Sequence, residues 1–299
     1  MIVAVLTAVT LIAFAANSLL CRMALGGHLI DPVSFTTIRL VSGALALITI
    51  SRVFGESKMP QKIKGSWGSG FALFAYAAAF SLAYVSLSTG IGALILFGSV
   101  QMTMIGAALK SGEKIGPMQW VGSVAAICGL IYLVLPGISA PDPLGAILMC
   151  VSGIAWGVYS IRGKGVSSPV TMTAENFTRS APMAVIASVV AFSSVHLDRF
   201  GILLALISGV VTSGLGYVLW YKTLRSLTTT QASVVQLVVP VLAAFGGVAF
   251  LSEQVSARLI VASAMILGGV ALAVVKRKPM VSPHSGANLT TEPNRATND

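Results

Sequence analysis

Residues 231–253, QASVVQLVVPVLAAFGGVAFLSE, decide how this chain folds. The stretch is almost entirely apolar and reaches the roughly 20 residues that an α-helix needs to cross the hydrocarbon core of a bilayer. Pro240 lacks a backbone N–H group and predicts a helix kink, and Glu253 ends the apolar run. We therefore expect a membrane-spanning helix here rather than the core helix of a soluble domain.

An earlier stretch, residues 91–113, repeats this design with the sequence IGALILFGSVQMTMIGAALKSGE. It ends at Glu113, which lies 140 residues before Glu253. The same spacing links three further pairs of residues: Arg22 with Arg162, Arg39 with Arg179, and Gly129 with Gly269. Ala83–Tyr84 also aligns with Trp220–Tyr221 if about three residues are inserted in the second copy. The chain is therefore predicted to be a tandem duplication, a pattern common among membrane transport proteins.

The composition requires a bilayer as the solvent. Of the 299 residues, 56% are hydrophobic and 9% are charged, and the mean hydropathy is +0.89. Soluble domains carry roughly 25% charged residues, so this chain could not cover a globule with polar surface. The net charge of +10 is explained by membrane topology, and we expect no nucleic-acid partner.

Ten apolar segments have the length of membrane spans, and inside a bilayer such segments must be helices. We predict an all-α integral membrane protein with spans at about 2–21, 33–54, 66–86, 90–109, 117–136, 143–161, 172–193, 201–221, 231–251 and 256–275. The first repeat is placed at residues 1–138 and the second at residues 139–278. A polar tail at residues 279–299 is predicted to be disordered.

Lysine and arginine set the predicted orientation. With a cytoplasmic N-terminus, fourteen of the nineteen basic residues fall inside the cell, and only Arg22, Arg199 and Arg258 fall outside. Arg39 and Arg179 lie within spans. Both termini are therefore predicted to be cytoplasmic. Because five helices per repeat is an odd number, the second copy must be inverted relative to the first.

No pattern of residues predicts catalysis, a metal site or a cofactor. Cys21, Cys128 and Cys150 all lie in apolar spans, where small packing residues are the expected interpretation. Histidines form no cluster along the chain. There is also no Ser/His/Asp set, no phosphate-binding loop and no pair of carboxylates within a span, so we do not expect an enzyme.

Several spans carry aromatic and neutral polar residues that could line a central cavity. The candidates for substrate contact are Asn17, Tyr76, Tyr84, Gln101, Trp156, Tyr159, Tyr217 and Gln236. An alternative stays open for aromatic residues near helix ends, such as Tyr84, which are often interfacial anchors. Polar side chains such as Gln101 can instead serve only to bond a neighbouring helix.

Charged residues within spans are costly and therefore informative. Arg39, Glu175 and Arg179 are the candidates, and Glu175 with Arg179 forms an i,i+4 pair in the favourable order. Either arginine could offer positive charge to a substrate carboxylate or to the carbonyls of an interrupted helix, or could instead extend to the membrane surface. Glu113 and Glu253 are expected to cap the helix that follows each in the chain.

Small residues form faces that let helices pack closely, within one molecule or between subunits. These faces consist of Gly122, Ala126 and Gly129 in the fifth span and Ala264, Gly268 and Gly269 in the tenth.

Over residues 2–276 the chain resembles the drug/metabolite transporter superfamily, in its ten-helix EamA-type branch. The resemblance is carried by the repeat, by the Pro240 helix that ends at Glu253, by the matching Glu113, and by the glycine-rich ends of the fifth and tenth spans. The fourth span departs from the pattern, with Val100 where its repeat partner has Pro240. The resemblance implies a cavity enclosed by helices 1–4 and 6–9, with helices 5 and 10 beside it. It is closest to bacterial inner-membrane exporters of amino acids, including aromatic ones, that work by alternating access.

Three alternatives remain. A nucleotide-sugar or sugar-phosphate carrier would need Lys or Arg deep in the bundle, and the spans hold no lysine. A drug/proton antiporter would need a carboxylate in the first span, which has Asn17 instead. A lipid scramblase fits the hydropathy but not the inverted repeat. Because Glu175 can pair with Arg179, it is a poor proton carrier, and we predict facilitated diffusion of a small-molecule substrate.

Overall fold

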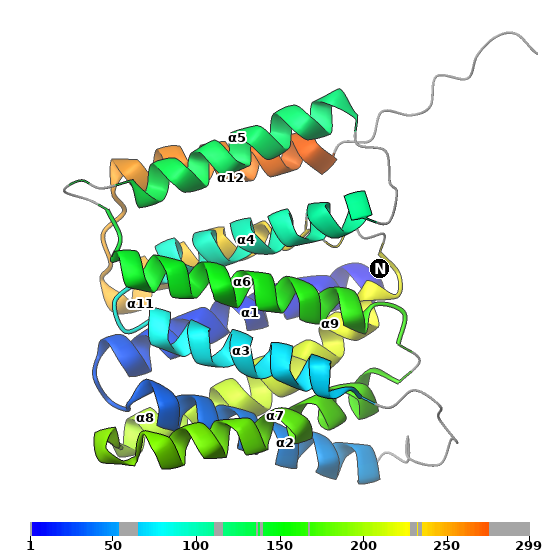
Figure 1. The fold of residues 1–299 in the computed structure, drawn as a ribbon, viewed down its shortest axis with the longest axis vertical. Helices are drawn as coiled ribbons and strands as arrows, with labels where there is room; N and C mark the ends of the chain where they lie inside the picture. Colours follow the sequence, from blue (N-terminus) through cyan, green and yellow to red (C-terminus); the bar gives the residue numbers. More distant parts are fainter. Residues whose placement is uncertain are drawn as a thin grey trace, which may run out of the picture.

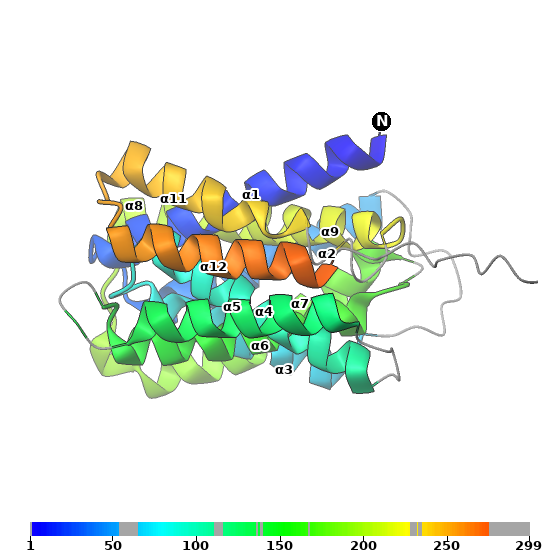
Figure 2. The same cartoon turned by 90° about the horizontal axis from the view of Figure 1, so that it is seen from above.

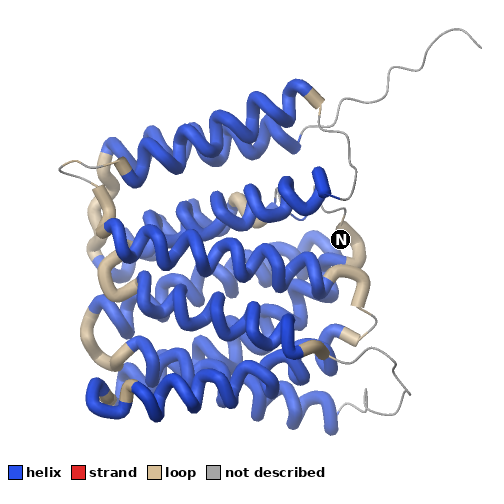
Figure 3. Tube along the Cα trace, in the orientation of Figure 1, coloured by secondary structure: helices blue, strands red, loops and turns tan. Residues whose placement is uncertain are grey.

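The computed structural model shows a helical bundle with no strand among the residues that it describes (Figure 3). These are residues 2–53, 65–110, 116–135, 137, 140–166, 168–227, 232 and 235–274. Glu113 and the predicted tail at residues 279–299 lie outside them, as does most of the start of the ninth span.

The ten predicted spans are confirmed as helices. The first half contains α1 (Ile2–Gly26), α2 (Pro32–Val53), α3 (Trp67–Ala83), α4 (Thr89–Lys110) and α5 (Pro117–Val134). The second half contains α6 (Pro143–Gly163), α7 (Pro169–Val190), α11 (Val238–Leu251) and α12 (Ala257–Val274). Its eighth span is one continuous run, Arg199–Leu224, made of α8 (Arg199–Ile207), the π-helix η3 (Ser208–Leu215) and α9 (Gly216–Leu224). A 3₁₀ turn, η2 (Phe192–Ser194), precedes it.

The outside of the bundle is apolar. Among the described residues, five helices are long and apolar enough to cross a membrane, and four shorter helices are also apolar. Large apolar side chains stay exposed on them, including Leu45, Phe71, Ile147, Phe245 and Phe250. A bilayer is the environment that such a surface requires. The 22-residue α7 belongs to neither group, because Glu175, Asn176 and Arg179 lie in its first three turns.

When each helix is replaced by its counterpart in the other half, the helix–helix contacts recur, as the two-fold relation of an inverted repeat requires (Figure 1). In the first half α4 packs on α6, and its counterpart α11 packs on α1. Similarly, α3 packs on α6 and α7, while the eighth span packs on α1 and α2. The pairs α2–α7, α4–α11 and α5–α12 each join a helix to its own counterpart.

The α5–α12 pair lies along one side of the bundle (Figures 1 and 2). The two helices approach closely because their contact is made of small residues. A Cβ atom at Gly269 would lie 2.6 Å from the Gly122 carbonyl oxygen, and one at Gly129 would lie 2.7 Å from the Met265 Cβ. Gly268 faces open space. Gly122, Ala126, Gly129 and Gly269 of the predicted small-residue faces are thus buried where the repeats pack, whereas Ala264 and Gly268 are exposed.

Candidate functional site

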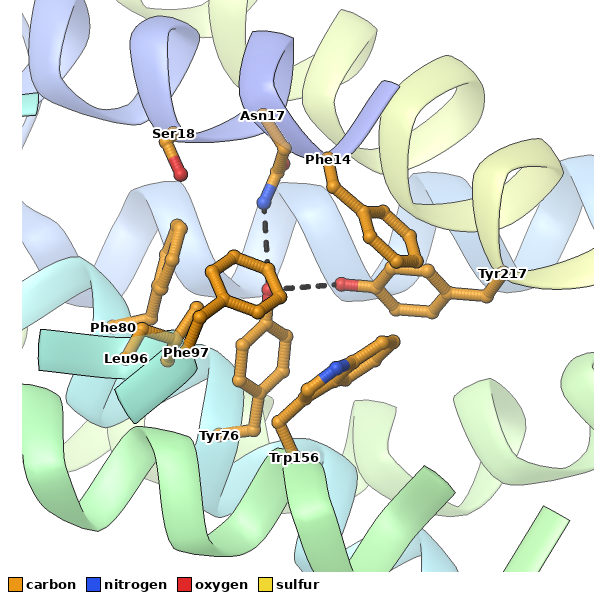
Figure 4. Close-up of a pocket in the computed structure, with 9 residues that line it drawn as sticks. All are labelled: Phe14, Asn17, Ser18, Tyr76, Phe80, Leu96, Phe97, Trp156 and Tyr217. Atoms are coloured by element: carbon orange, nitrogen blue, oxygen red, sulfur yellow. Dashed lines mark hydrogen bonds between the residues drawn. The ribbon is translucent and has the colours of Figure 1, made fainter. Parts of the chain in front are cut away.

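A closed cavity lies where the two halves meet (Figure 4). Helices α1, α3 and α4 from the first half and α6 and α9 from the second half contribute its lining residues, which are Phe14, Asn17, Ser18, Tyr76, Phe80, Leu96, Phe97, Trp156 and Tyr217. The volume open to the centre of a water-sized sphere is ≈ 10 Å³, which is room for about one water molecule. The side chains therefore close on one another at the centre of the bundle.

Trp156 is the centre of the aromatic contacts. Its ring centroid lies 4.7 Å from that of Tyr217, 5.0 Å from that of Tyr76, and 5.4 Å from that of Phe14, whose ring is nearly perpendicular to it. The indole Nε1 donates a hydrogen bond of 3.3 Å to Gln236 Oε1. Gln236 in turn donates to the Ala232 carbonyl at 3.0 Å. Gln236 thus supports Trp156 from behind and is not itself a lining residue.

Hydroxyl and amide groups meet beside these rings. The Tyr217 hydroxyl donates to the Tyr76 hydroxyl at 3.1 Å, and Asn17 Nδ2 lies 3.5 Å from the same Tyr76 oxygen (Figure 4). Asn17 Oδ1 accepts from Ser208 Oγ at 2.7 Å and from Thr212 Oγ1 at 3.0 Å. The carbonyl of Asn17 is therefore occupied by donors from η3.

The π-helix η3 places these donors. Ser208, Thr212 and Ser213 are all buried on it and all point toward Asn17. The wider turn is able to approach α2 because Gly209 has no side chain: a methyl group there would clash with the Arg39 carbonyl oxygen. Single-turn π segments occur frequently at functional sites.

Arg39 lies directly behind the two tyrosine hydroxyls, with its side chain 1% exposed. Its Nη2 donates to Tyr217 at 2.7 Å and to Tyr76 at 3.1 Å, and its Nε donates to Ser213 Oγ at 2.8 Å. The guanidinium also lies 5.2 Å from the Tyr76 ring centroid and 5.3 Å from that of Phe80. Its Nη1 has no acceptor among the described residues. The alternative in which Arg39 extends to the membrane surface is therefore excluded.

Three other predicted contacts lie outside the cavity lining. Tyr84 is fully buried, packs on Phe80 at 4.7 Å and donates to the Thr89 carbonyl at 3.4 Å, so it is not an interfacial anchor. Tyr159 is also buried, 5.6 Å from Trp156 between ring centroids. Gln101 is buried on α4.

The predicted Pro240 kink appears as a break one turn earlier. Helix α11 begins at Val238, and residues 236–237 form a turn before it. A proline cannot donate to the carbonyl four residues before it, here that of Gln236. This oxygen accepts from the Val239 N–H at 3.0 Å instead. Pro240 therefore ends the preceding segment just beside the Gln236–Trp156 contact.

Glu253 caps a different helix from the one expected. Its carboxylate accepts from the Thr89 N–H at 2.9 Å, at the start of α4, and pairs with Arg22 at 3.4 Å. The following helix α12 is capped by the Ser256 hydroxyl instead. The prediction was wrong because Ser252 adopts a left-handed conformation, φ 54°, at the end of α11. The chain then turns Glu253 back across the repeat interface.

The Arg22 contacts join several helices at one end of the bundle. Arg22 Nη1 donates to the Tyr84 carbonyl at 3.1 Å and to the Val85 carbonyl at 2.9 Å. We call Arg22, Glu253 and Thr89 the end clamp, since they join α1, α4 and the α11–α12 turn. The repeat equivalent Arg162 instead donates to two serine hydroxyls of the α3 start, at 2.9 and 3.0 Å.

Glu175 and Arg179 form the predicted ion pair, with 3.1 Å between Oε2 and Nη1. Glu175 also accepts from the Gly65 N–H. Both side chains are partly exposed and line an open groove of ≈ 660 Å³ between α2, α3 and α7, separate from the central cavity. Arg39 and Arg179, which are equivalent in the repeat, therefore have different surroundings. Among the described residues, no three His, Cys, Asp or Glu side chains gather as metal ligands would.

Comparison with known proteins agrees with this architecture. Residues 143–275 match the EamA-like transporter family. An uncharacterized protein of Pseudomonas aeruginosa is 46% identical over 272 residues, which cover 91% of this chain and 94% of that one. A probable amino-acid metabolite efflux pump of Escherichia coli K12 is 21% identical over 89% of this chain and 92% of its own length.

A solved crystal structure has the same fold. It superposes with a TM-score of 0.63 at 18% sequence identity and covers 92% of this chain and 99% of its own. Together with the ten helices, these matches show that the chain is a multi-pass membrane protein of the EamA-like transporter family, within the drug/metabolite transporter superfamily.

Proposed function

We propose that this transporter exports amino acids or related small metabolites from the cytoplasm across the inner membrane by alternating access. The observation that carries the proposal is the cavity between the two halves, which joins an aromatic wall to a polar corner. The wall at Trp156 suits an apolar or aromatic body, and the corner at Asn17 and Arg39 suits a charged or hydrogen-bonding end. The efflux pump named among its relatives supports the same direction of transport.

The route that we propose runs through the repeat interface. Helices that exchange under the two-fold relation can rock against each other around a fixed central site. With both termini in the cytoplasm, as the distribution of Lys and Arg indicates, the end clamp faces the outside of the cell. Opening it would release the substrate.

We further propose facilitated diffusion. A proton-coupled carrier needs a titratable group that faces the path and exchanges protons with both sides. The described cavity lining contains no carboxylate and no histidine. Glu175 is held by Arg179 and by the Gly65 amide in a separate groove.

Counterflow in proteoliposomes tests this function. Vesicles loaded with an unlabelled amino acid should take up the labelled compound without a pH gradient. An imposed pH gradient should not cause accumulation, and Glu175→Gln should exchange at a rate close to that of the unaltered protein. Accumulation that depends on the pH gradient and is abolished by Glu175→Gln would show that the ion pair is a coupling site.

A further inference from the structure

We infer that the central site selects organic monoanions over zwitterions, and that the membrane potential drives their export. The inference rests on the proposed function and narrows its substrate class. It names a carboxylate with an aromatic or apolar body and no free ammonium group, such as an N-acylated aromatic amino acid. Two features of the site carry it: an excess of hydrogen-bond donors and an uncompensated positive charge.

The polar hydrogens of the site outnumber the acceptor atoms near them. Arg39 uses Nε and Nη2, and its Nη1 group has no acceptor among the described residues. The Tyr76 oxygen accepts from Arg39 and Tyr217, Asn17 Nδ2 lies 3.5 Å from the same oxygen, and no hydrogen bond donated by the Tyr76 hydroxyl is found in the described part of the chain. The one amide carbonyl nearby, Asn17 Oδ1, already accepts from Ser208 and Thr212. A carboxylate supplies several acceptor positions and would satisfy these hydrogens.

The charge balance gives the same result. Every described acidic residue is already engaged elsewhere. Asp31, Asp142 and Asp198 accept from backbone N–H groups at the starts of α2, α6 and α8, Glu175 pairs with Arg179, and Glu253 pairs with Arg22. Arg39 thus carries a buried charge with no ion-pair partner in the described structure. A buried charge is costly unless it is compensated, and a ligand with one negative charge would compensate it.

A zwitterion fits this site less well than an anion. Its carboxylate could meet Arg39, but its ammonium group would find no carboxylate among the described residues that line the cavity. The faces of Trp156 and Tyr76 offer only a weaker attraction for a cation. A zwitterion would also leave the net charge of the centre at +1.

The monoanion makes each transport cycle electrogenic. One negative charge crosses the membrane with the substrate, and the empty carrier returns without it. An inside-negative potential therefore pushes the substrate outward with no need for a proton. This agrees with a described cavity lining that holds no carboxylate and no histidine.

Three compounds with the same phenyl ring separate the alternatives. N-acetylphenylalanine is an anion, phenylalanine is a zwitterion, and phenylalaninamide is a cation at low pH. We expect counterflow at pH 6 to be fastest for the anion, at least tenfold slower for the zwitterion, and undetectable for the cation. Faster exchange of phenylalanine than of its acetylated form would overturn the inference and leave the proposed function standing. Exchange of none of them would contradict the proposed function itself.

The potential is tested with valinomycin and a potassium gradient at equal pH on both sides. Because one charge moves with each substrate, a tenfold outward potassium gradient should hold the labelled anion inside at about one tenth of its outside concentration. Equal concentrations at steady state would contradict electrogenic transport.

Arg39→Gln and Arg179→Gln form a matched pair of variants. Arg39→Gln removes the fixed charge and should slow the anion more than tenfold relative to phenylalanine. Arg179→Gln removes the repeat equivalent, which does not contact the cavity, and should leave the order of the compounds unchanged. If Arg39→Gln does not fold, Arg39→Lys keeps the charge and should retain the preference for the anion. A preference that survives in folded Arg39→Gln, or that is lost in folded Arg39→Lys, would refute the assignment.

Discussion

Trp156 can be tested by removing one hydrogen bond while keeping a ring. Its side chain is 2% exposed, so Trp156→Ala would leave a large cavity and cost roughly 3–5 kcal/mol, which would confuse stability with transport. Trp156→Phe removes the Nε1 donor to Gln236 and keeps an aromatic surface. We expect a loss of about 1 kcal/mol in the free energy of unfolding and a severalfold change in counterflow rate.

Trp67→Phe is the control for this experiment, because Trp67 is 63% exposed on the outside of α3. It should change neither thermal stability nor exchange. Equal transport by the two variants would show that Trp156 has a packing role only.

At the level of single residues, the sequence predicted which side chains lie at the cavity better than it predicted the contacts that each one makes. Asn17, Tyr76, Trp156 and Tyr217 do line one cavity. Arg39 and Arg179 have the same place in the repeat, and the sequence predicted the ion pair of Arg179 with Glu175 but not that Arg39 is the buried one. That difference depends on which helix lies opposite, and a span's own residues do not specify it.

The π-helix η3 is the element on which the polar corner depends. Gly209→Ala would place a methyl group against the Arg39 carbonyl and the Ser42 hydroxyl, so α2 and η3 would have to separate. We expect a loss of about 1–3 kcal/mol in stability, measured by thermal unfolding in detergent, together with loss of counterflow.

Gly268→Ala provides the comparison, because nothing lies within 4 Å of a Cβ atom at that position. This variant should be neutral or slightly more stable. If both alanine variants unfold at the same temperature, the close approach of η3 to α2 is not needed for the fold.

The end clamp is the second element open to a direct test. Glu253→Gln keeps an oxygen for the Thr89 N–H but removes the charge that holds Arg22. Loss of about 1 kcal/mol from the closed state would open this end about fivefold more often. A cysteine placed at Ser18, which lines the cavity, should then react about fivefold faster with a membrane-impermeant reagent from that side, in a background without native cysteines.

Glu175→Gln removes the ion pair of the separate groove and should leave this labelling rate unchanged. An unchanged rate in Glu253→Gln would mean that the clamp does not hold the end closed.

Hydropathy was sufficient to predict all ten spans, because the bilayer imposes both their length and their helical state. It could not reveal η3, since hydropathy measures only how apolar a segment is, and the same residues are equally apolar in a π-helix and in an α-helix. The sequence also failed to predict which helix Glu253 caps. A cap on the following helix is a local expectation, whereas the observed cap on α4 depends on packing between the repeats.

For the whole molecule, orientation in the membrane is the prediction on which the proposed export route depends. Cysteines that replace His196 and Lys164, both exposed and at opposite ends of the bundle, should react with an impermeant reagent from opposite sides of the membrane. In intact cells only the His196 position should be labelled. Labelling of both positions from outside would overturn the proposed orientation and the export route built on it.

The low apolarity of α7 has a consequence for how the protein is made. A charged residue near the centre of a span costs roughly 2.5–3.5 kcal/mol during insertion by the translocon, and α7 carries Glu175 and Arg179. Its packing partners α2 and α3 are both synthesised earlier in the chain. We therefore expect isolated α7 to insert in only a minority of molecules when fused to a reporter with glycosylation sites. The same helix should insert almost fully when residues 1–168 precede it, because α2 and α3 of the first repeat are then already in the membrane and can pack against α7 of the second repeat.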